Sequence, residues 1–350
     1  MTAATPQEIL RWLEIMVEKG GSDLYVTVGA PPMLRVGDEL LPLSEDKATP
    51  DTMRRLLADI TTHEQQAAFF SSCEFNMSLE LRGLGRFRVN VLQQRQDIAL
   101  VIRAINESPP SPAELGIPDV VCSAALGKHG LILVTGATGS GKSTSLAALI
   151  DHRNEHLSGH ILTVEDPVEY IHTHKRSLVT QREVGVDTQS FEAALKNALR
   201  QRPDVILVGE IRSLEVMRQV MNIAETGHLV MATLHANSAL QAIDRVVNLF
   251  PNDERRHVLL GLSYNLSVVL SQRLMRSTSG GRVAAMEVLV NAPDIADALR
   301  VEDRESVKRL INAGSGGSVD LDRCLLSLLS KGIISREAAL AECESSNFIN

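Results

Sequence analysis

The sequence feature that most constrains the fold is the octapeptide Gly-Ala-Thr-Gly-Ser-Gly-Lys-Ser at residues 136–143. It fills every fixed position of the phosphate-loop pattern G-x-x-x-x-G-K-[ST]. An apolar segment precedes it at 131–135, and residues 144–150 are typical of a helix. The alternative is a glycine-rich turn that merely begins a helix. The complete pattern in this strand–loop–helix context favours a phosphate loop.

The residue types in this loop indicate which ligand it binds. Glycines tolerate positive φ and let the backbone approach a ligand closely. Successive backbone N–H groups at a helix N-terminus attract a polyphosphate. Lys142 is placed to reach the β- and γ-phosphates, and the Ser143 hydroxyl is placed to bind Mg²⁺.

Length and composition exclude several classes of protein. A chain of 350 residues predicts about two domains. The net charge of −8 argues against a non-specific nucleic-acid binder, and 3% aromatic residues argue against stacking on single strands. The four cysteines are far apart in the sequence, which predicts reduced thiols in a cytoplasmic protein and no zinc site. We therefore expect no nucleic-acid partner.

No segment predicts direct insertion into a membrane. The first residues contain neither a basic nor an apolar stretch of the kind found in signal peptides. The most apolar predicted helix, at 257–271, is interrupted by polar residues and is too short to span a bilayer. Any membrane association is therefore expected to come through partners.

The N-terminal part of the chain predicts a small α+β domain over residues 1–105, with helices packed on a sheet. Residues 106–112 are rich in proline and predict a linker, which we place at 106–118. The expected helices are 6–19 and 50–70, and the expected strands are 22–28, 33–36, 39–43, 79–82, 85–92 and 98–103.

The remaining residues, 119–350, alternate between strand and helix patterns. This alternation predicts a parallel sheet with helices on both faces. Beyond Pro251 the chain is expected to be mostly helical, with one strand near 283–290 and a flexible loop at 314–318. The other expected strands are 131–135, 160–165, 205–208 and 229–234, and the helices between them are 191–201 and 214–225.

Three of these strands are followed by side chains suited to catalysis: Glu165, Glu210 and His235. Functional groups gather at the carboxyl ends of strands in an open α/β sheet. Each residue alone has an ordinary alternative, a surface carboxylate or a loop histidine. Beside a phosphate loop, one carboxylate is needed to hold Mg²⁺ and another to orient or deprotonate the attacking water. The sequence leaves open which glutamate is the base.

Four motifs in order resemble those of the secretion ATPase superfamily. Residues 163–169 resemble its Asp box, residues 202–212 its atypical Walker B motif, and residues 224–235 its His box. With the phosphate loop, their spacing resembles the PilT/PilU group, the retraction ATPases of type IV pili. Residues 22–24 and 31–35 are similar to the N-terminal domain of that group. The resemblance implies a PAS-like α+β domain at 1–105, a linker at 106–118, and a RecA-like P-loop ATPase domain with C-terminal helices at 119–350.

The resemblance also assigns roles to single residues. It implies catalytic roles for Lys142, Glu165, Glu210 and His235, with Glu165 activating water and Ser143 and Glu210 binding the metal. Arg200 and Arg212 flank the Walker B motif, and we expect them either to pair with its carboxylates or to contact phosphate. The implied contacts with ATP and Mg²⁺ are Gly136, Ala137, Thr138, Gly139, Ser140, Gly141, Lys142, Ser143, Thr144, Arg88, Arg103 and His228, with Arg86 beside the two arginines. The alternative for these N-terminal arginines is solvated charge on an edge strand.

The function implied by this resemblance is Mg²⁺-dependent ATP hydrolysis by a cytoplasmic homohexamer. Such a ring is peripheral at the inner membrane, where it acts on the pilus platform protein in retraction and twitching motility. Residues 181–188, 209–213 and 232–237 resemble the PilU branch, and 295–303 do not reproduce the PilT retraction motif. We therefore expect an accessory to a PilT homologue. The alternative is a ring-forming adaptor that binds ATP. An extension or secretion ATPase is disfavoured because the chain lacks the four-cysteine zinc insertion and the larger N-terminus.

Overall fold

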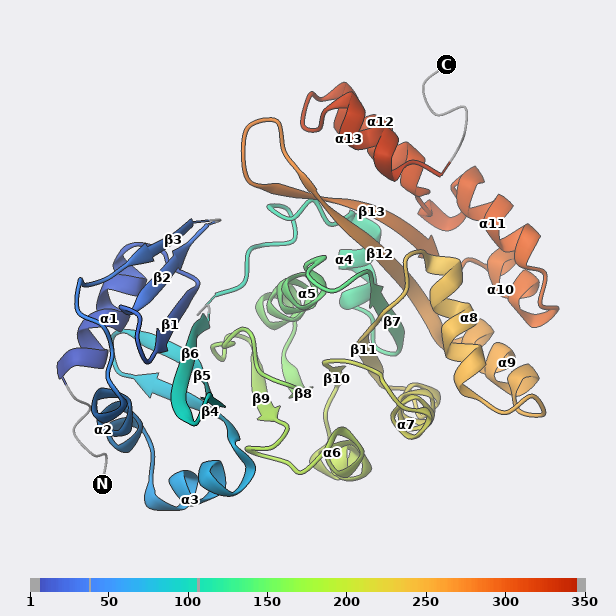
Figure 1. Cartoon of the computed structure of the whole chain (residues 1–350). Coiled ribbons are helices and arrows are strands. Elements are labelled where there is room, and N and C mark those ends of the chain that lie inside the picture. Colours follow the sequence, from blue (N-terminus) through green and yellow to red (C-terminus); the bar gives the residue numbers. More distant parts are fainter. Residues whose placement is uncertain (1–6, 38, 106–107, 345–350) are drawn as a thin grey trace. The chain divides into compact units, whose positions relative to one another are not determined.

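The computed structural model describes residues 7–37, 39–105 and 108–344, and the chain divides into two compact units, Met1–Ser108 and Pro109–Asn350. Both units combine helices and sheets (Figure 1). Residues 106–107 of the predicted linker lie outside the described residues. Among the described residues, no helix has both the length and the apolar character needed to cross a bilayer.

The first unit is built on a six-stranded antiparallel sheet with the strand order β3-β2-β1-β6-β5-β4. Ile9, Leu13 and Met16 recur at helical spacing on one side of α1, and all three are fully buried in the core of this unit. Its elements are α1 (Gln7–Glu18), β1 (Asp23–Thr27), β2 (Met33–Val36), β3 (Glu39–Pro42), α2 (Pro50–Ile60), α3 (His63–Ser72), β4 (Glu74–Leu81), β5 (Gly85–Gln94) and β6 (Asp97–Ile105).

The single helix predicted over residues 50–70 is wrong, because the structure has two helices there. The backbone of Thr61 is extended and ends α2. Thr62 then caps α3, and its side chain and that of Gln65 form a reciprocal capping box. The strand predicted from residue 79 begins earlier, at Glu74.

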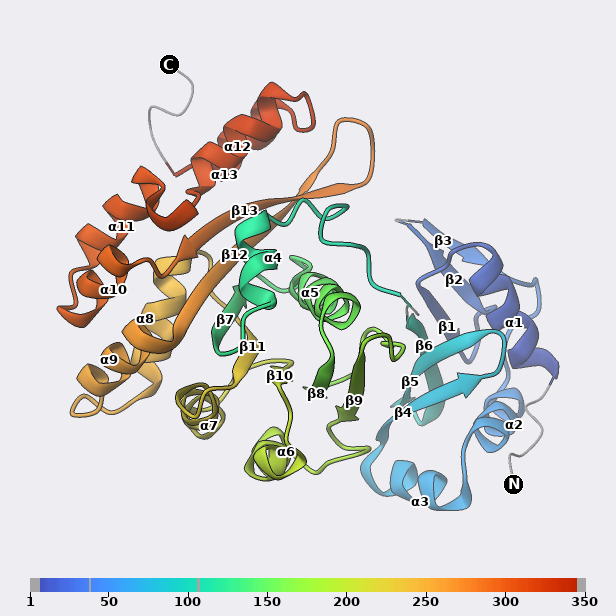
Figure 2. The ribbon, with the colours of Figure 1, turned by 180° about the vertical axis from the view of Figure 1, so that it is seen from behind.

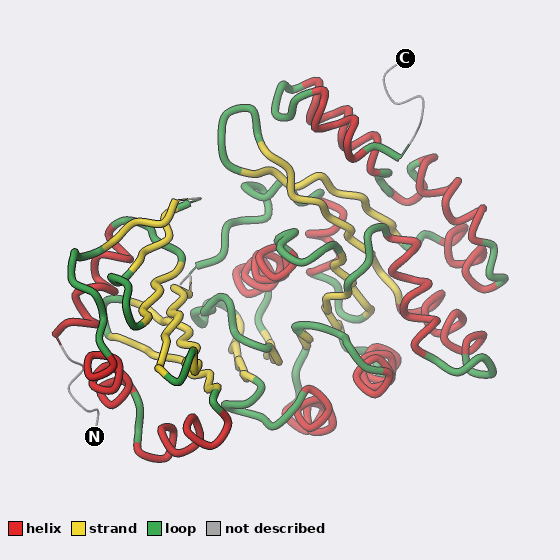
Figure 3. The backbone as a smooth tube through the Cα atoms, viewed as in Figure 1, coloured by secondary structure: helices red, strands yellow, loops and turns green. Residues whose placement is uncertain are grey.

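The second unit is built on a seven-stranded sheet with the order β13-β12-β7-β11-β10-β8-β9, in which only β13 is antiparallel to its neighbour. The helices after β13 follow one another to the end of the described chain (Figure 3). The elements up to β13 are α4 (Asp119–Ala125), β7 (Gly130–Thr135), α5 (Lys142–His156), β8 (Gly159–Glu165), β9 (Ser177–Glu183), α6 (Phe191–Ala198), η1 (Leu199–Gln201), β10 (Val205–Val208), α7 (Leu214–Glu225), β11 (Leu229–Leu234), α8 (Ala239–Leu249), α9 (Arg255–Asn265), β12 (Leu266–Arg276) and β13 (Arg282–Val290). They are followed by α10 (Pro293–Arg300), α11 (Arg304–Ala313), η2 (Ser315–Gly317), α12 (Leu321–Ser330) and α13 (Arg336–Glu342).

Helices cover both faces of this sheet, as the sequence predicted. Alternate strand residues belong to different cores: Ile132 and Val134 pack with α4 and α5, whereas Leu131 and Leu133 pack with α6 to α9. The two helical layers of this unit are visible from both sides of the sheet when Figure 1 and Figure 2 are compared. All six residues of β7 are buried, so the glycine-rich loop begins at the end of a strand that is held in the core.

The structure differs from the sequence-based expectations at three places in this unit. The helix expected at 257–271 ends at Asn265, and Leu266 begins β12, since an apolar run alone does not distinguish a buried helix from a buried strand. Strand β9 was not predicted, because it is partly polar and lies at the edge of the sheet. The loop expected at 314–318 contains η2, and Ser318 is buried with its hydroxyl accepting a hydrogen bond from the Val290 N–H.

Candidate nucleotide-binding and hydrolysis site

The glycine-rich loop connects the end of β7 at Thr135 to the start of α5 at Lys142. Gly136 has a φ of 148°, and a Cβ built there would lie 2.4 Å from the Gln272 carbonyl oxygen. Gly141 is the N-cap of α5, and no side chain caps its first N–H groups. The loop therefore excludes side chains at Gly136 and leaves helix N–H groups free to bind a ligand.

The Lys142 side chain folds back over this loop. Its ammonium donates hydrogen bonds to the Gly136 carbonyl at 3.0 Å and the Ala137 carbonyl at 2.9 Å. Burial lowers the pKa of Lys142, while the negative charges of Glu210 and Glu169 act in the opposite direction. A cation thus lies at the place where a loop of this type holds phosphate.

Two hydroxyl groups at the loop lack a protein partner. Thr135 Oγ1 and Ser140 Oγ are buried and have no hydrogen-bond partner among the described residues. Buried polar groups in proteins are nearly always paired. Protein atoms alone therefore do not satisfy this loop, and its residues fit a polyphosphate ligand.

Gln272 supports the loop from β12 and was not identified from the sequence. Its side chain is 1% exposed, and its Nε2 donates a 2.6 Å hydrogen bond to the Ser140 carbonyl. It was missed because the stretch before it was predicted to be helical. Its one sequence signal is that an amide side chain follows the apolar run of β12.

We expect Gln272→Met to weaken nucleotide binding about tenfold, because the Ser140 carbonyl would lose its buried donor and the loop would relax. The measurement is titration of the purified protein with a fluorescent ATP analogue. Gln201→Met is the control. Gln201 lies before the amino end of β10, whereas the glycine-rich loop follows the carboxyl end of β7. Equal affinity of Gln272→Met and wild type would show that the loop does not depend on this contact.

Glu210 lies beyond the end of β10, between two basic side chains. The His235 Nε2 atom is 2.9 Å from Glu210 Oε1, and an Arg212 nitrogen is 2.7 Å from Oε2. Burial alone would raise the pKa of Glu210. The hydrogen bond from Arg212 and the charges of Arg212, His235 and Lys142 outweigh that effect and lower it. Glu210 is therefore ionised at neutral pH, as a metal ligand must be.

The backbone around Glu210 is fixed by the neighbouring strand. The Thr233 hydroxyl donates to the Gly209 carbonyl at 2.5 Å, and the Ile211 N–H donates to the Thr233 carbonyl at 3.0 Å. A Cβ at Gly209 would come within 3.2 Å of the Glu165 Cα, so glycine at this position allows β10 and β8 to pack closely. The two glutamates are thereby held on adjacent strands.

Glu165, the last residue of β8, has a different environment. Its Oε1 accepts a hydrogen bond of 2.6 Å from the Thr163 hydroxyl and one of 3.2 Å from Gln181 Nε2. Burial raises the pKa of Glu165 to about 7, despite these hydrogen bonds. A carboxyl with a pKa near neutrality suits proton transfer better than metal binding.

Tyr170 joins this region to α5 and was also not identified from the sequence. Its hydroxyl shares a 3.1 Å hydrogen bond with the Thr144 hydroxyl, and its ring is buried. Tyr170 directly follows the stretch that resembles an Asp box, which is the only signal that the sequence gives. The loop, Glu165, Glu210 and His235 thus lie at the carboxyl edge of one sheet.

The structure does not bring His228 to this edge. His228 precedes β11, and its carbonyl accepts a hydrogen bond from the Gly130 N–H at the amino end of β7. A six-residue strand separates it from His235, which is roughly 20 Å at 3.3 Å per residue. A contact between His228 and a nucleotide in the loop of the same chain is incompatible with this placement.

The two arginines that flank the Walker B stretch lie at different edges. Arg200, in η1 before β10, lies at the amino edge, as His228 does. Arg212, by contrast, pairs with Glu210 and lies 3.9 Å from Asp166.

Arg88 and Arg103 belong to the first unit, where they are opposite each other on β5 and β6. Both strands lie inside the sheet and not at its edge, although the Arg103 side chain remains exposed to solvent. The Arg103 Nε donates to Asp23 Oδ1 at 2.7 Å, and Asp23 is buried. This ion pair orients Arg103 within its own unit.

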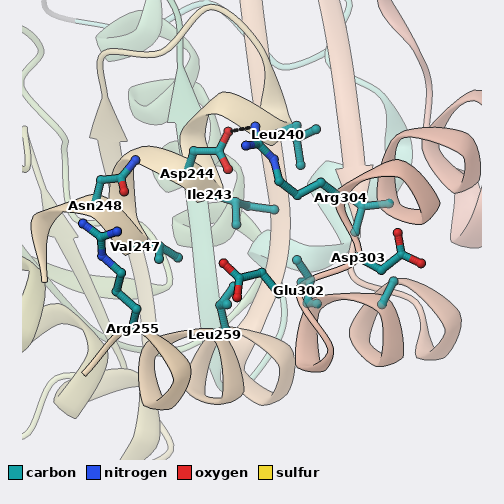
Figure 4. Close-up of a pocket in the computed structure, with 13 residues that line it drawn as sticks. Leu240, Ile243, Asp244, Val247, Asn248, Arg255, Leu259, Glu302, Asp303 and Arg304 are labelled. Carbon is teal, nitrogen blue, oxygen red and sulfur yellow. Dashed lines mark hydrogen bonds and ion pairs between the residues drawn. The ribbon is translucent and has the colours of Figure 1, made fainter. Parts of the chain in front are cut away.

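A cavity of about 120 Å³ lies elsewhere in the second unit, between α8, α9, α10 and α11 (Figure 4). Its lining is apolar at Ile243, Val247 and Leu259, and an ion pair between Asp244 and Arg304 lies at its edge. None of its lining residues belongs to the phosphate loop. It does include Ala298, Leu299, Glu302 and Asp303, from the stretch 295–303.

Comparison with known proteins gives closely similar relatives over nearly the whole chain. The model of the type II/IV secretion system protein family matches residues 54–318. The type IV pilus ATPase PilU of Pseudomonas aeruginosa is 44% identical over 97% of this chain and 90% of its own length. The type IV pilus retraction ATPase PilT of the same organism is 42% identical over 95% of this chain and 97% of its own length. A crystal structure of the pilus retraction motor PilT with bound ADP has a TM-score of 0.92 at 39% identity, covering 97% of this chain and 98% of that one.

Proposed function

This chain belongs to the type II/IV secretion system protein family, and on that premise we propose that it is an ATP-hydrolysing motor for type IV pilus retraction. One observation carries the proposal beyond family membership. The phosphate loop, the ionised Glu210 with His235, and Glu165 with its raised pKa lie at one edge of one sheet. That arrangement provides for phosphate binding, metal binding and proton transfer together.

In the proposed mechanism, Gly136 to Thr144 hold the triphosphate, and Lys142 exchanges its two loop carbonyls for phosphate oxygens. Ser143 and Glu210 would hold Mg²⁺, which when bound neutralises charge on the β- and γ-phosphates. The described residues contain no cluster of three or more acidic, histidine or cysteine side chains that could bind a metal alone. Two protein ligands fit Mg²⁺ at a nucleotide, since substrate phosphates and water complete its coordination.

Glu165 accepts the proton of the attacking water in this proposal. Its pKa of about 7 makes it an effective base near neutral pH, whereas the lowered pKa of Glu210 makes that residue a poor one. His235 contacts Glu210 directly, so its position responds to any change at the metal and γ-phosphate. The raised pKa of Glu165 and the lowered pKa of Glu210 support this division of roles.

Motor action requires that ATP binding favours one arrangement of the two units over another. We propose that residues 106–118 act as the hinge and that Arg88 and Arg103 bind the nucleotide from the first unit. The working form is a homohexamer in the cytoplasm, peripheral at the inner membrane through the platform protein of the pilus machinery. Support comes from the likeness to PilT and PilU over both units.

Within this family we propose the role of an accessory to a PilT homologue. The supporting observation is that residues 295–303, which depart from the retraction motif, form α10 and the turn that lines the cavity in Figure 4. ATP hydrolysis does work on the platform only if the two conformational states contact it with different free energies. A chain with a complete hydrolysis site but an altered sequence at 295–303 is therefore expected to depend on a second motor.

The test is pilus retraction in a strain that lacks the PilT homologue but expresses this protein. We expect no twitching in that strain. In a strain that has the homologue, we expect this protein to increase retraction force. Normal retraction without the homologue would refute the accessory role, and a Lys142→Ala variant that still increases force would favour an ATP-binding adaptor over a motor.

A further inference from the structure

The Gln181 side chain on β9 is held by hydrogen bonds to three groups. Its Oε1 accepts from the His172 N–H at 2.8 Å. Its Nε2 donates to the Tyr170 carbonyl at 2.9 Å and to Glu165 Oε1 at 3.2 Å. Gln181 is the register partner of Thr163, so it lies next to Glu165 on the same face of the sheet.

The backbone determines which end of this amide faces Glu165. The oxygen and nitrogen of a glutamine amide are assigned from their hydrogen-bond partners. Here the partners are a backbone N–H, which only donates, and a backbone carbonyl, which only accepts. Only one orientation satisfies both, and it presents the NH₂ group to the Glu165 carboxyl.

The two side-chain donors to Glu165 share one of its oxygens. Thr163 and Gln181 both donate to Oε1, and neither of them binds Oε2. We propose that Gln181 is a positioning residue that turns the Glu165 carboxyl so that Oε2 faces the attacking water. The inference rests on the role of Glu165 proposed above.

Gln181 also connects Glu165 to the phosphate loop. It binds the Tyr170 carbonyl, and the Tyr170 hydroxyl shares a hydrogen bond with Thr144 in the first turn of α5. The position of the base relative to the loop is thereby set through one tyrosine. A glutamine on an edge strand thus fixes the geometry between the base and the phosphate that it serves.

The charged surroundings of Glu165 define what loss of this contact does. Burial raises the pKa of Glu165, and the charge of Glu169 raises it further. The hydrogen bonds from the Thr163 and Gln181 side chains and from the Glu169 backbone lower it. The other charged groups on the elements next to it are Asp166 and Arg212, Glu210 with His235, and Glu183 opposite it on β9. Removing the Gln181 donor leaves these groups in place and increases the protonated fraction of Glu165 at a given pH.

The experiment is the pH dependence of turnover at saturating ATP for Gln181→Met and Gln181→Glu. For Gln181→Met we expect turnover about tenfold below wild type at pH 7, with the deficit shrinking to about twofold at pH 9, because a base without its donor needs a higher pH to ionise. Gln181→Glu keeps an acceptor for the His172 N–H but places a second carboxyl beside Glu165, so we expect a larger deficit at pH 7. The KM for ATP should stay within about twofold, since the loop is not changed.

Thr180→Val is the matched control, because it removes a comparable contact between β9 and β8 on the other face. Thr180 Oγ1 shares a 2.9 Å hydrogen bond with His160 Nε2 and does not touch Glu165. We expect this variant to lose thermal stability but to keep the wild-type pH profile. A deficit in Gln181→Met that is equal at every pH, or a profile identical to that of Thr180→Val, overturns the inference.

A Glu165→Gln variant separates failure of this inference from failure of the proposed function. If Glu165→Gln hydrolyses ATP normally, Glu165 is not the base and the proposed mechanism fails with it. If Glu165→Gln is inactive but Gln181→Met has a wild-type pH profile, only the positioning role of Gln181 is overturned. Both outcomes are read from the same assay.

Discussion

Replacing Lys142 with alanine is expected to abolish ATP hydrolysis and to leave the fold of the second unit intact. The ammonium already lies over the loop, bound to the Gly136 and Ala137 carbonyls, and is partly desolvated there. Removing it takes away the one positive charge that the loop directs at the transferred phosphate, where electrostatic stabilisation is strongest. The measurement is phosphate release by the purified protein, at least about 10²-fold below wild type.

Lys196→Ala provides the control for this prediction, since Lys196 is an exposed residue in the last turn of α6. It should hydrolyse ATP like wild type. Circular dichroism and thermal unfolding should be alike for both variants and the wild type. Near-normal turnover of Lys142→Ala would remove the basis for assigning the loop as the nucleotide site.

The two glutamates should fail in different ways when each is changed to glutamine. Both variants should lose about 10²-fold or more in turnover. In the proposed mechanism Glu165→Gln removes only the proton acceptor, so it should still bind Mg·ATP at normal Mg²⁺. Glu210→Gln removes the proposed charged ligand, so it should need a higher Mg²⁺ concentration for binding.

Turnover of the wild type should also rise with pH. A base whose pKa is raised to about 7 is mostly protonated at pH 6 and mostly ionised at pH 8, so activity increases through that range. Glu215→Gln, an exposed residue on α7, is the control and should keep both the rate and the pH profile. The outcome that would contradict the Mg²⁺ prediction for the two glutamates is equally simple. If Glu210→Gln and Glu165→Gln have the same Mg²⁺ dependence, the separate roles assigned to the two carboxylates are wrong.

Family and fold class were predicted correctly from the sequence, and local signals explain why. Strands β10 and β11 and helix α7 were predicted to the residue. The strands are apolar runs that are fully buried on both faces, and α7 begins after Ser213, whose side chain caps it. The phosphate loop is likewise a continuous segment, so its conformation follows from residues that are adjacent in the sequence.

The contacts that hold the site in place could not be predicted in this way. Gln272 contacts the loop from β12, which was predicted to be helical. Gln181 contacts Glu165 from β9, an edge strand that was not predicted. Their roles depend on which strands become neighbours, and no local pattern states that. His228 was placed at the nucleotide because it belongs to a motif, yet the motif runs along a whole strand and its two histidines lie at opposite edges.

The position of β12 has a consequence for how the protein can be divided. Every motif of the hydrolysis site is complete by residue 235, yet β12 lies between β7 and β13 and supplies the Gln272 contact with the loop. A fragment that ends after those motifs would leave β7, whose residues are all buried, as a bare apolar edge. Exposed edges of this kind pair with other chains and aggregate. A nucleotide-binding piece of this protein that keeps β7 covered therefore extends at least to the end of β12 at Arg276.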